Sequence, residues 1–212
     1  MPDDSTPEKN GTRELLLEVA ERLFAQKGFD SVTVRQLAKA AGVNGAMVSY
    51  HFDSKNGLLV ALLEEKFPRN RERMIEIANS LLDPWEKLLA TVDVYADRIF
   101  DGYNFHRIIM REMSLSQRPE VVEIIIGHLS TILGMIRGFI LEGQEKGIFR
   151  PVDVELTLAT VFGSFSTLIG QGKLLCIMLK EDCEDNIYSE KSRDRFISHL
   201  KELLRVHLMK ER

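Results

Sequence analysis

Cysteine, tryptophan and proline are all scarce in this sequence. Two cysteines, one tryptophan and six prolines occur among 212 residues. The cysteines, Cys176 and Cys183, lie seven residues apart, which matches neither a CxxC redox motif nor a zinc ribbon. Sparse cysteine is typical of reducing compartments, so we interpret both as reduced thiols. A redox switch formed by the pair is the alternative.

The chain also lacks an excess of positive charge. Lys and Arg total 28 against 32 Asp and Glu, giving a net charge of −4 and a pI near 5.8. This balance argues against a surface that is basic throughout and binds nucleic acid non-specifically. It does not argue against a small basic patch, because net charge is a sum over the whole chain. Hydrophobic residues at 44% and charged residues at 28% indicate an ordinary soluble globular protein and exclude global disorder.

No segment has the pattern of a signal peptide or a membrane span. Residues Met1 to Asn10 are polar and contain no apolar core. The most apolar stretch, Ile124 to Leu141, contains His128 and Arg137, so a buried helix explains it better than a membrane span. We therefore predict a cytoplasmic protein with no membrane partner.

Strand alternation is missing, and apolar residues recur instead with helical spacing. Pro68 falls inside one apolar-periodic stretch, where it should kink or briefly break the helix. The sequence therefore predicts an all-α fold of about nine helices. The clearest of these are Thr12 to Lys27, Val34 to Ala41, Gly45 to His51, a helix beginning at Lys55, Pro84 to Asp101, Asn104 to Leu115, Pro119 to Lys146, Asp153 to Leu179 and Lys191 to Lys210.

The segment from Thr33 to Lys55 has the proportions of a helix-turn-helix. Thr33 and Gln36 form a capping-box pattern at the start of the first short helix. Gly42 permits a tight left-handed turn before the second. Residues 31 to 60 contain three bases and one acid, whereas residues 1 to 30 contain four bases and seven acids. Positive charge is thus concentrated where a DNA backbone would lie.

The stretch TRELLLEVAERLFAQKGFDSVTVRQLAKAAGVNGAMVSYHFDSKNGLL resembles the DNA-binding domain of the tetracycline-repressor (TetR) family of transcription regulators. The similarity covers residues 12 to 59 and combines several family markers in order. It implies an all-α homodimer with an N-terminal three-helix, helix-turn-helix DNA-binding domain at residues 1–59. A larger C-terminal helical domain at residues 60–212 would bind ligand and form the dimer.

The resemblance also implies which residues contact DNA. Thr33 and Arg35 would meet phosphate at the start of the first short helix. The second helix would face base edges, and the aromatic-histidine pair with the lysine after it would contact phosphates. The predicted DNA-binding set is Thr33, Arg35, Asn44, Gly45, Ala46, Ser49, Tyr50, His51 and Lys55. Tyr50 and His51 as packing residues, and Arg35 and Lys55 as solvated bases, are the alternatives.

The reading helix departs from many relatives in two places. It has no Lys or Arg between Asn44 and Tyr50, and Ser49 occupies a position where an aromatic residue is common. Bidentate recognition of guanine by arginine is therefore not expected from this helix. Specificity would have to come from the remaining side chains, from methyl contacts or from DNA shape.

Candidates for a ligand pocket come from the helices of the C-terminal part, where bundles form cavities. Arg107 and Arg111 share a helix face and could hold a carboxylate or phosphate, although an exposed ion pair is the alternative. The histidines do not have the converging partners that a metal needs, so neither a metal nor a cofactor is predicted. The predicted pocket residues are Trp85, Tyr95, Tyr103, His106, Arg107, Met110, Arg111 and His128.

The helix predicted at residues 153–179 is apolar on nearly all sides and needs cover all round. A symmetric partner could supply that cover together with the helix at residues 191–210. We therefore predict a ligand-responsive repressor that binds a palindromic operator as a homodimer and is released by a small-molecule effector. A constitutive DNA-binding protein without ligand response is the alternative. No nucleophile elbow, P-loop or dinucleotide motif indicates an enzyme.

Overall fold

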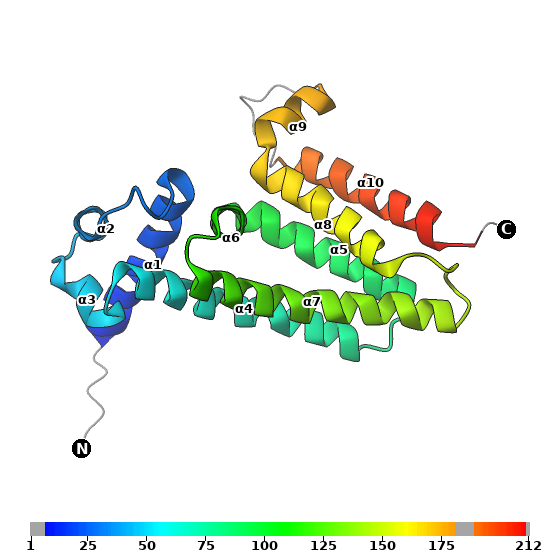
Figure 1. The fold of residues 1–212 in the computed structure, drawn as a ribbon, viewed down its shortest axis with the longest axis horizontal. Coiled ribbons are helices and arrows are strands. Elements are labelled where there is room, and N and C mark those ends of the chain that lie inside the picture. The colour runs from blue at the N-terminus through cyan, green and yellow to red at the C-terminus, as the bar shows by residue number, and fades with distance from the viewer. Residues whose placement is uncertain (1–6, 181–188, 211–212) are drawn as a thin grey trace, which may run out of the picture. The chain divides into compact units, whose positions relative to one another are not determined.

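The structure is a computed structural model that describes residues 7–180 and 189–210. Within these ranges the regular structure is helical, apart from one isolated bridge between Phe149 and Met209, as the sequence predicts. Figure 1 follows the ten helices along the chain. They are α1 (Pro7–Lys27), α2 (Val34–Ala41), α3 (Ala46–Phe52), α4 (Lys55–Asn79), α5 (Pro84–Asp101), α6 (Tyr103–Leu115), α7 (Pro119–Glu145), α8 (Val154–Gly170), α9 (Gly172–Leu179) and α10 (Glu190–Leu208).

The chain folds into two compact units. Unit 1 takes the residues up to Arg69 together with Arg107–Ile125, and unit 2 takes Asn70–His106 with the chain from Ile126 onward. Three helices, α4, α6 and α7, therefore contribute residues to both units. The domain boundary predicted between residues 59 and 60 lies inside α4, ten residues before unit 1 leaves that helix.

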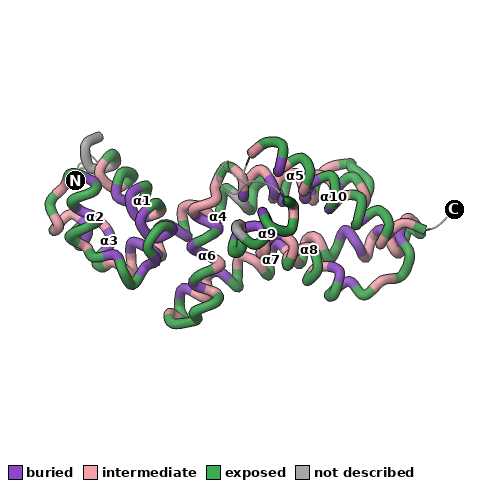
Figure 2. The backbone as a smooth tube through the Cα atoms, turned by 90° about the horizontal axis from the view of Figure 1, so that it is seen from above, coloured by how far each residue is buried: buried purple, intermediate pink, exposed green. Residues whose placement is uncertain are grey.

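Local signals place the short helices of unit 1. Gly28 follows α1 with a φ of +82° and Gly42 follows α2 with a φ of +67°, a conformation that costs glycine little. At the start of α2, the Gln36 amide donates to Thr33 Oγ1 (3.2 Å) and the Thr33 amide donates to Gln36 Oε1 (2.8 Å). The predicted capping box is confirmed. The buried positions of α1 to α4 form the core of this unit (Figure 2).

The structure excludes a break at Pro68, one of the two outcomes predicted there, and it divides one predicted helix into two. α4 continues through Pro68 without a break, although proline removes one helical hydrogen bond. Phe67 and Met74 are buried on either side of it, and their packing offsets that loss. The single helix predicted at residues 153–179 is two helices, because Gln171 between Gly170 and Gly172 leaves the helical conformation. Glycines weaken a helix, and two flank this position.

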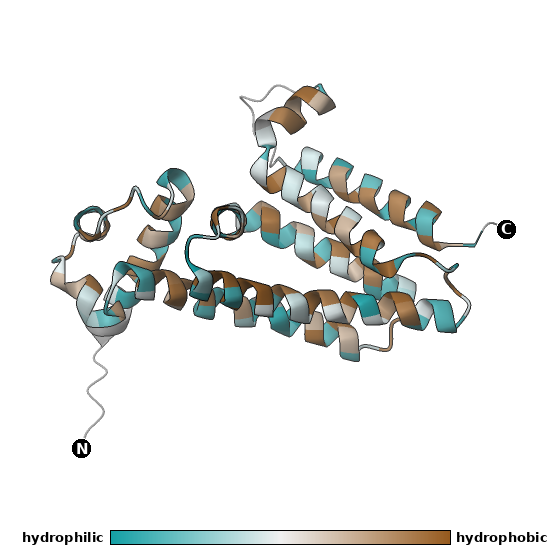
Figure 3. Cartoon of the chain, viewed as in Figure 1, coloured by the Kyte–Doolittle hydropathy of each residue, from teal (hydrophilic) through white to brown (hydrophobic). Residues whose placement is uncertain are grey.

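Unit 2 is a bundle in which hydrophobic residues concentrate along α7 and α8 (Figure 3). The Asp83 side chain caps α5, with Pro84 in the first turn, as predicted. Ion pairs join α10 to α5: Lys201 Nζ lies 2.6 Å from Asp93, and Arg193 pairs with Asp97. Cys176 is buried. Cys183 and residues 181–188 of the acidic segment lie outside the described residues.

α7 is the one helix among the described residues that is long and apolar enough to cross a membrane by length and composition alone. It also supplies buried residues to both units. Val121 and Ile125 are buried in unit 1, while Ile132 and Ile140 are buried in unit 2. Most of its most apolar 18-residue window is nevertheless not buried, so the predicted burial of this helix holds only at these inward-facing positions.

Candidate nucleic-acid interface

α2, the turn at Gly42 and α3 form the candidate reading surface. Val48 and Phe52 lie one helical turn apart on α3 and are 0% and 5% exposed, so they anchor α3 on the core. The opposite face of the same helix is exposed at Ala46, Ser49 and Tyr50. Tyr50 is 62% exposed. A short helix held from one side thus presents a free face of the size that enters a major groove.

The predicted contact residues before α3 surround the N-termini of the two short helices. Thr33 and Arg35 are exposed, and Thr33 Oγ1 is engaged in the capping box. Asn44 Oδ1 accepts from the Ala46 amide at 2.9 Å, so Asn44 caps the turn and α3 begins at Ala46, one residue later than predicted. Gly45 is partly exposed beside it.

His51 and Lys55 lie deeper than the other predicted contacts. His51 Nε2 is buried and makes no hydrogen bond within the described residues. The Lys55 ammonium donates to the carbonyl oxygens of Phe29 (2.9 Å) and Val32 (2.8 Å) and lies 4.1 Å from the centre of the Phe29 ring. Burial lowers the Lys55 pKa. An ammonium has three donors, so one is left for a phosphate. Holding the α1–α2 loop is a role of Lys55 that its position in the motif does not reveal.

Residues from five helices of unit 2 line an apolar cavity. Two threonines, Thr91 and Thr157, lie in its walls. Their hydroxyls donate hydrogen bonds to the backbone carbonyls of Lys87 and Asp153, respectively. Among the residues that the structure describes, no charged side chain lines the cavity. The lining residues are Met74, Leu88, Thr91, Val92, Tyr95, Leu129, Ile132, Leu133, Ile136, Ile140, Thr157, Leu158, Val161, Phe162, Phe165 and Leu204. The cavity can therefore take a hydrocarbon group.

Aromatic and basic residues gather around Tyr95. Its ring meets Phe165 edge-on with centroids 4.8 Å apart and meets His106 at 5.9 Å. Burial raises the Tyr95 pKa to about 12 and lowers the pKa of His106 to about 4. Burial, reinforced by the positive charge of Arg98, also lowers the His128 pKa to about 4. Both imidazoles are therefore neutral at pH 7.

Comparison with known proteins agrees with this geometry. The profile described as "Bacterial regulatory proteins, tetR family" matches residues 16–62. The HTH-type transcriptional repressor KstR2 of Rhodococcus jostii (strain RHA1) is 31% identical over 160 residues, which are 73% of this chain and 76% of the repressor. The chain belongs to the TetR family.

Two further relatives extend the likeness beyond the helix-turn-helix. The fatty acid metabolism regulator protein of Bacillus subtilis (strain 168) is 25% identical over 157 residues, which are 73% of this chain and 79% of that protein. The crystal structure of the regulator FadR from Bacillus subtilis, in complex with stearoyl-CoA, has the same fold. Its TM-score is 0.70 at 22% identity, covering 90% of this chain and 96% of FadR. This TetR-family protein is a DNA-binding regulator of transcription, and its relatives are regulators rather than enzymes.

Only Tyr95 of the predicted pocket residues lines the cavity of this TetR-family chain. His106 contacts the Tyr95 ring and His128 lies near enough to Arg98 for that charge to lower its pKa, whereas Trp85 packs edge-on against Phe149. Arg111 lies outside unit 2, which contains this cavity. It belongs to unit 1, and its guanidinium packs on Gly28, where a Cβ would come within 2.3 Å of Arg111 Cζ.

The other three predicted pocket residues, Tyr103, Arg107 and Met110, are also absent from the cavity walls. The residues that do form the walls come largely from α7 and α8, which the sequence marks only as strongly apolar. Which residues hold a ligand stays a prediction, because a shared helix face does not show which positions of several helices meet at one cavity. The apolar character of residues 153–179 was the available signal.

Replacing Tyr50 by alanine should weaken operator binding about tenfold or more and leave folding intact. The ring is exposed on the free face of α3, and exposed substitutions change stability by roughly 0.5 kcal/mol or less. Fluorescence anisotropy with an operator duplex measures the affinity, and urea unfolding checks the fold. Tyr50→Phe separates ring from hydroxyl. Unchanged affinity in Tyr50→Ala would place the contact surface elsewhere.

His106 should make stability depend on pH. Its folded pKa of about 4 lies below the ordinary 6.5, so the unfolded chain binds more protons between these values. Stability contributed by neutral His106 is therefore present at pH 7 and is lost as pH falls below 6.5. From pH 7 to 5 the wild type should lose about 2 kcal/mol more than His106→Gln. Urea unfolding of the wild type and of His106→Gln at both pH values measures this difference. Equal losses in wild type and His106→Gln would refute it.

Proposed function

We propose that this chain is a homodimeric, ligand-responsive repressor whose α3 enters the major groove of each half of a palindromic operator. The exposed face of α3, opposite buried Val48 and Phe52, is the observation that carries the proposal. Residues 1–59 would supply the DNA contacts. Residues 60–212 would supply the ligand site and the dimer interface. The proposed contacts are Thr33, Arg35, Asn44, Gly45, Ala46, Ser49, Tyr50, His51 and Lys55.

The proposed dimer interface is the outer face of α8 and α10. Leu156 on α8 and Val206 on α10 are 66% and 67% exposed, and Leu203 lies beside Val206 on α10. These side chains line one groove between the two helices. α9 adds exposed Leu174, Ile177 and Met178. Exposed apolar groups of this size mark interaction surfaces, and a two-fold partner would cover them with the same residues.

The proposed effector carries a hydrocarbon chain that enters the apolar cavity of unit 2. The cavity volume is about 60 Å³, well below the roughly 300–1,000 Å³ of ligand sites. Binding would therefore have to move α5, α7 and α8 apart. A ligand can change DNA binding only if it binds one conformation of the protein more tightly than another. Movement of these helices would provide the two conformations, one with the cavity closed and one with it opened by ligand. That FadR was crystallised with stearoyl-CoA supports a long-chain acyl compound as the first probe.

Selection of bound fragments from the source genome tests the operator proposal. A shared palindrome should be enriched, and its binding should weaken steeply with salt because phosphate contacts release counterions. Thermal shift with stearoyl-CoA and shorter acyl-CoAs tests the effector proposal, since a ligand of the folded state raises Tm. Operator binding without any effector response would favour the constitutive alternative. Recovery of the protein in the cytoplasmic fraction is expected.

A further inference from the structure

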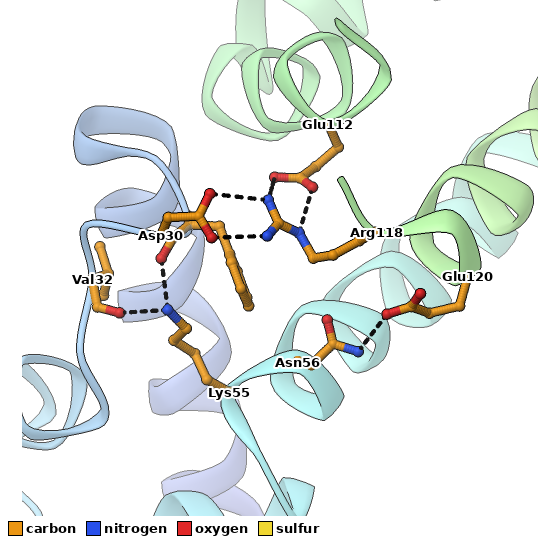
Figure 4. Close-up of polar contacts among 8 residues, drawn as sticks. Asp30, Val32, Lys55, Asn56, Glu112, Arg118 and Glu120 are labelled. Carbon is orange, nitrogen blue, oxygen red and sulfur yellow. Dashed lines mark hydrogen bonds and ion pairs between the residues drawn. The ribbon is translucent and has the colours of Figure 1, made fainter. Parts of the chain in front are cut away.

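One charged cluster joins four segments of unit 1, and we call it the Arg118 cluster: Phe29, Asp30, Lys55, Glu112 and Arg118 (Figure 4). Arg118, the residue before α7, donates from Nε to Glu112 Oε2 at 2.8 Å and from Nη2 to Glu112 Oε1 at 3.1 Å. The same guanidinium donates from Nη1 to Asp30 Oδ1 at 2.9 Å and from Nη2 to Asp30 Oδ2 at 3.4 Å. It thus bridges α6 to the α1–α2 loop.

The two halves of this bridge differ in burial. The side chains of Arg118 and Glu112 are 12% and 2% exposed, so their forked pair is an inner, water-excluded contact. Asp30 is 60% exposed, although its hydrogen bond to Arg118 still holds the Asp30 pKa below the ordinary value. The guanidinium also lies 4.2 Å from the Phe29 ring centre. The outer contact with Asp30 can therefore be removed while the buried pair remains.

Only a few bonds separate the Asp30–Arg118 contact from the start of α2. Asp30 lies in the loop whose Phe29 and Val32 carbonyls accept from Lys55, and Val32 directly precedes the Thr33 cap of α2. On the other side, Glu112 lies in the last turn of α6, and Arg118 immediately precedes α7. Both helices also contribute residues to unit 2. Asn56 Nδ2 adds a bond from α4 to Glu120 in the first turn of α7, at 3.1 Å.

We infer that Arg118 is a positioning residue through which the α6–α7 corner sets the position of α2 and thereby of the DNA-contacting surface. The Asp30–Arg118 contact is the separable half of that link. A change in α6 or α7 reaches Thr33 through Arg118, Asp30 and the loop that Lys55 holds. The regulatory role of this link rests on the proposed function. The physical link between α2 and the α6–α7 corner rests on the contacts alone.

Hydrogen exchange of the full-length protein, free and bound to a genome-selected operator duplex, tests the link. In the wild type, operator binding should slow exchange in α2 and α3 and also in residues 107–125. Asp30→Ala should keep the protection of α2 and α3 but lose that of residues 107–125. Asp30→Glu should restore it. A contact that only supported local folding would leave the remote protection unchanged.

Glu65→Gln is the matched control. It breaks the ion pair with Arg13, whose Nη1 lies 3.0 Å from Glu65 Oε2; both residues belong to unit 1, and neither belongs to α6 or α7. This variant should behave as wild type in residues 107–125. If Asp30→Ala transmits protection as the wild type does, the inference is overturned.

The free protein gives a second arm that needs no DNA. Asp30→Ala should speed exchange about two- to fivefold in both the first turn of α2 and the last turn of α6, the range expected for a partly exposed ion pair. If the wild type bound no operator, the proposed function would fail, but this measurement would still test whether Asp30 and Arg118 couple α2 to α6. Unchanged exchange in α6 of Asp30→Ala would overturn that coupling.

Discussion

Replacing Leu156 and Val206 together by glutamate should convert a dimer into a monomer of 24.2 kDa. Both side chains are about two-thirds exposed in the single chain, so the substitution leaves the subunit core intact. In a two-fold interface each residue occurs twice. Anchor residues contribute about 2 kcal/mol or more each, so the dimer dissociation constant should rise at least ~1,000-fold. Light scattering at micromolar protein measures the mass.

Operator binding should fall with the dimer, by about 100-fold or more, because one head alone retains mainly sequence-independent phosphate contacts. Leu81→Glu is the control. Leu81 is fully exposed between α4 and α5, outside the proposed interface, and its replacement should change neither mass nor affinity. A double variant that keeps the mass of two subunits would show that α8 and α10 do not form the interface.

Arg118→Met should destabilise the protein by about 3–5 kcal/mol, because it leaves the carboxylate of Glu112 buried without its partner. Glu112 is 2% exposed and holds both hydrogen bonds of the forked pair. Urea unfolding followed by circular dichroism measures the loss. The second substitution Glu112→Met should recover most of it, since removing both charges also removes the uncompensated one.

Arg13→Met provides the comparison for an exposed pair. Arg13 and its partner Glu65 are 41% and 29% exposed, so this change should cost less than about 1 kcal/mol. If Arg118→Met cost no more than Arg13→Met, the Arg118 cluster would be a surface ion pair without structural weight. Failure of Glu112→Met to recover stability would instead assign the loss to the contacts with Asp30 and Phe29.

The elements that sequence predicted well are governed by neighbouring residues. The Thr33–Gln36 capping box and the left-handed Gly28 and Gly42 depend on two to four consecutive residues, so local chemistry determines them. The helix-turn-helix and its family followed from a short motif for the same reason. The break at Gln171 was visible in its flanking glycines, but the continuous apolar pattern outweighed them.

Features that depend on residues far apart could not be predicted. Asp30 and Arg118 are separated by 88 positions, and nothing in either local pattern indicates the other. Arg111 shares a helix face with Arg107, which suggested a ligand clamp, yet it packs on Gly28. Lys55 occupies the position at which the family resemblance implies a phosphate contact. Its hydrogen bonds to the Phe29 and Val32 carbonyls could not be predicted, because these residues lie far from Lys55 in sequence and meet it only in the folded chain. The cavity walls likewise come from five helices that only tertiary packing brings together.

Competitive anisotropy with the genome-selected palindrome and a scrambled duplex of equal length and composition tests operator recognition most directly. The full-length protein at physiological salt should prefer the palindrome by about 1,000-fold or more, with one dimer bound per duplex. Tyr50→Ala should remove most of that preference, since the exposed face of α3 creates it. Equal affinity of the wild type for both duplexes would contradict sequence-specific operator binding by this protein.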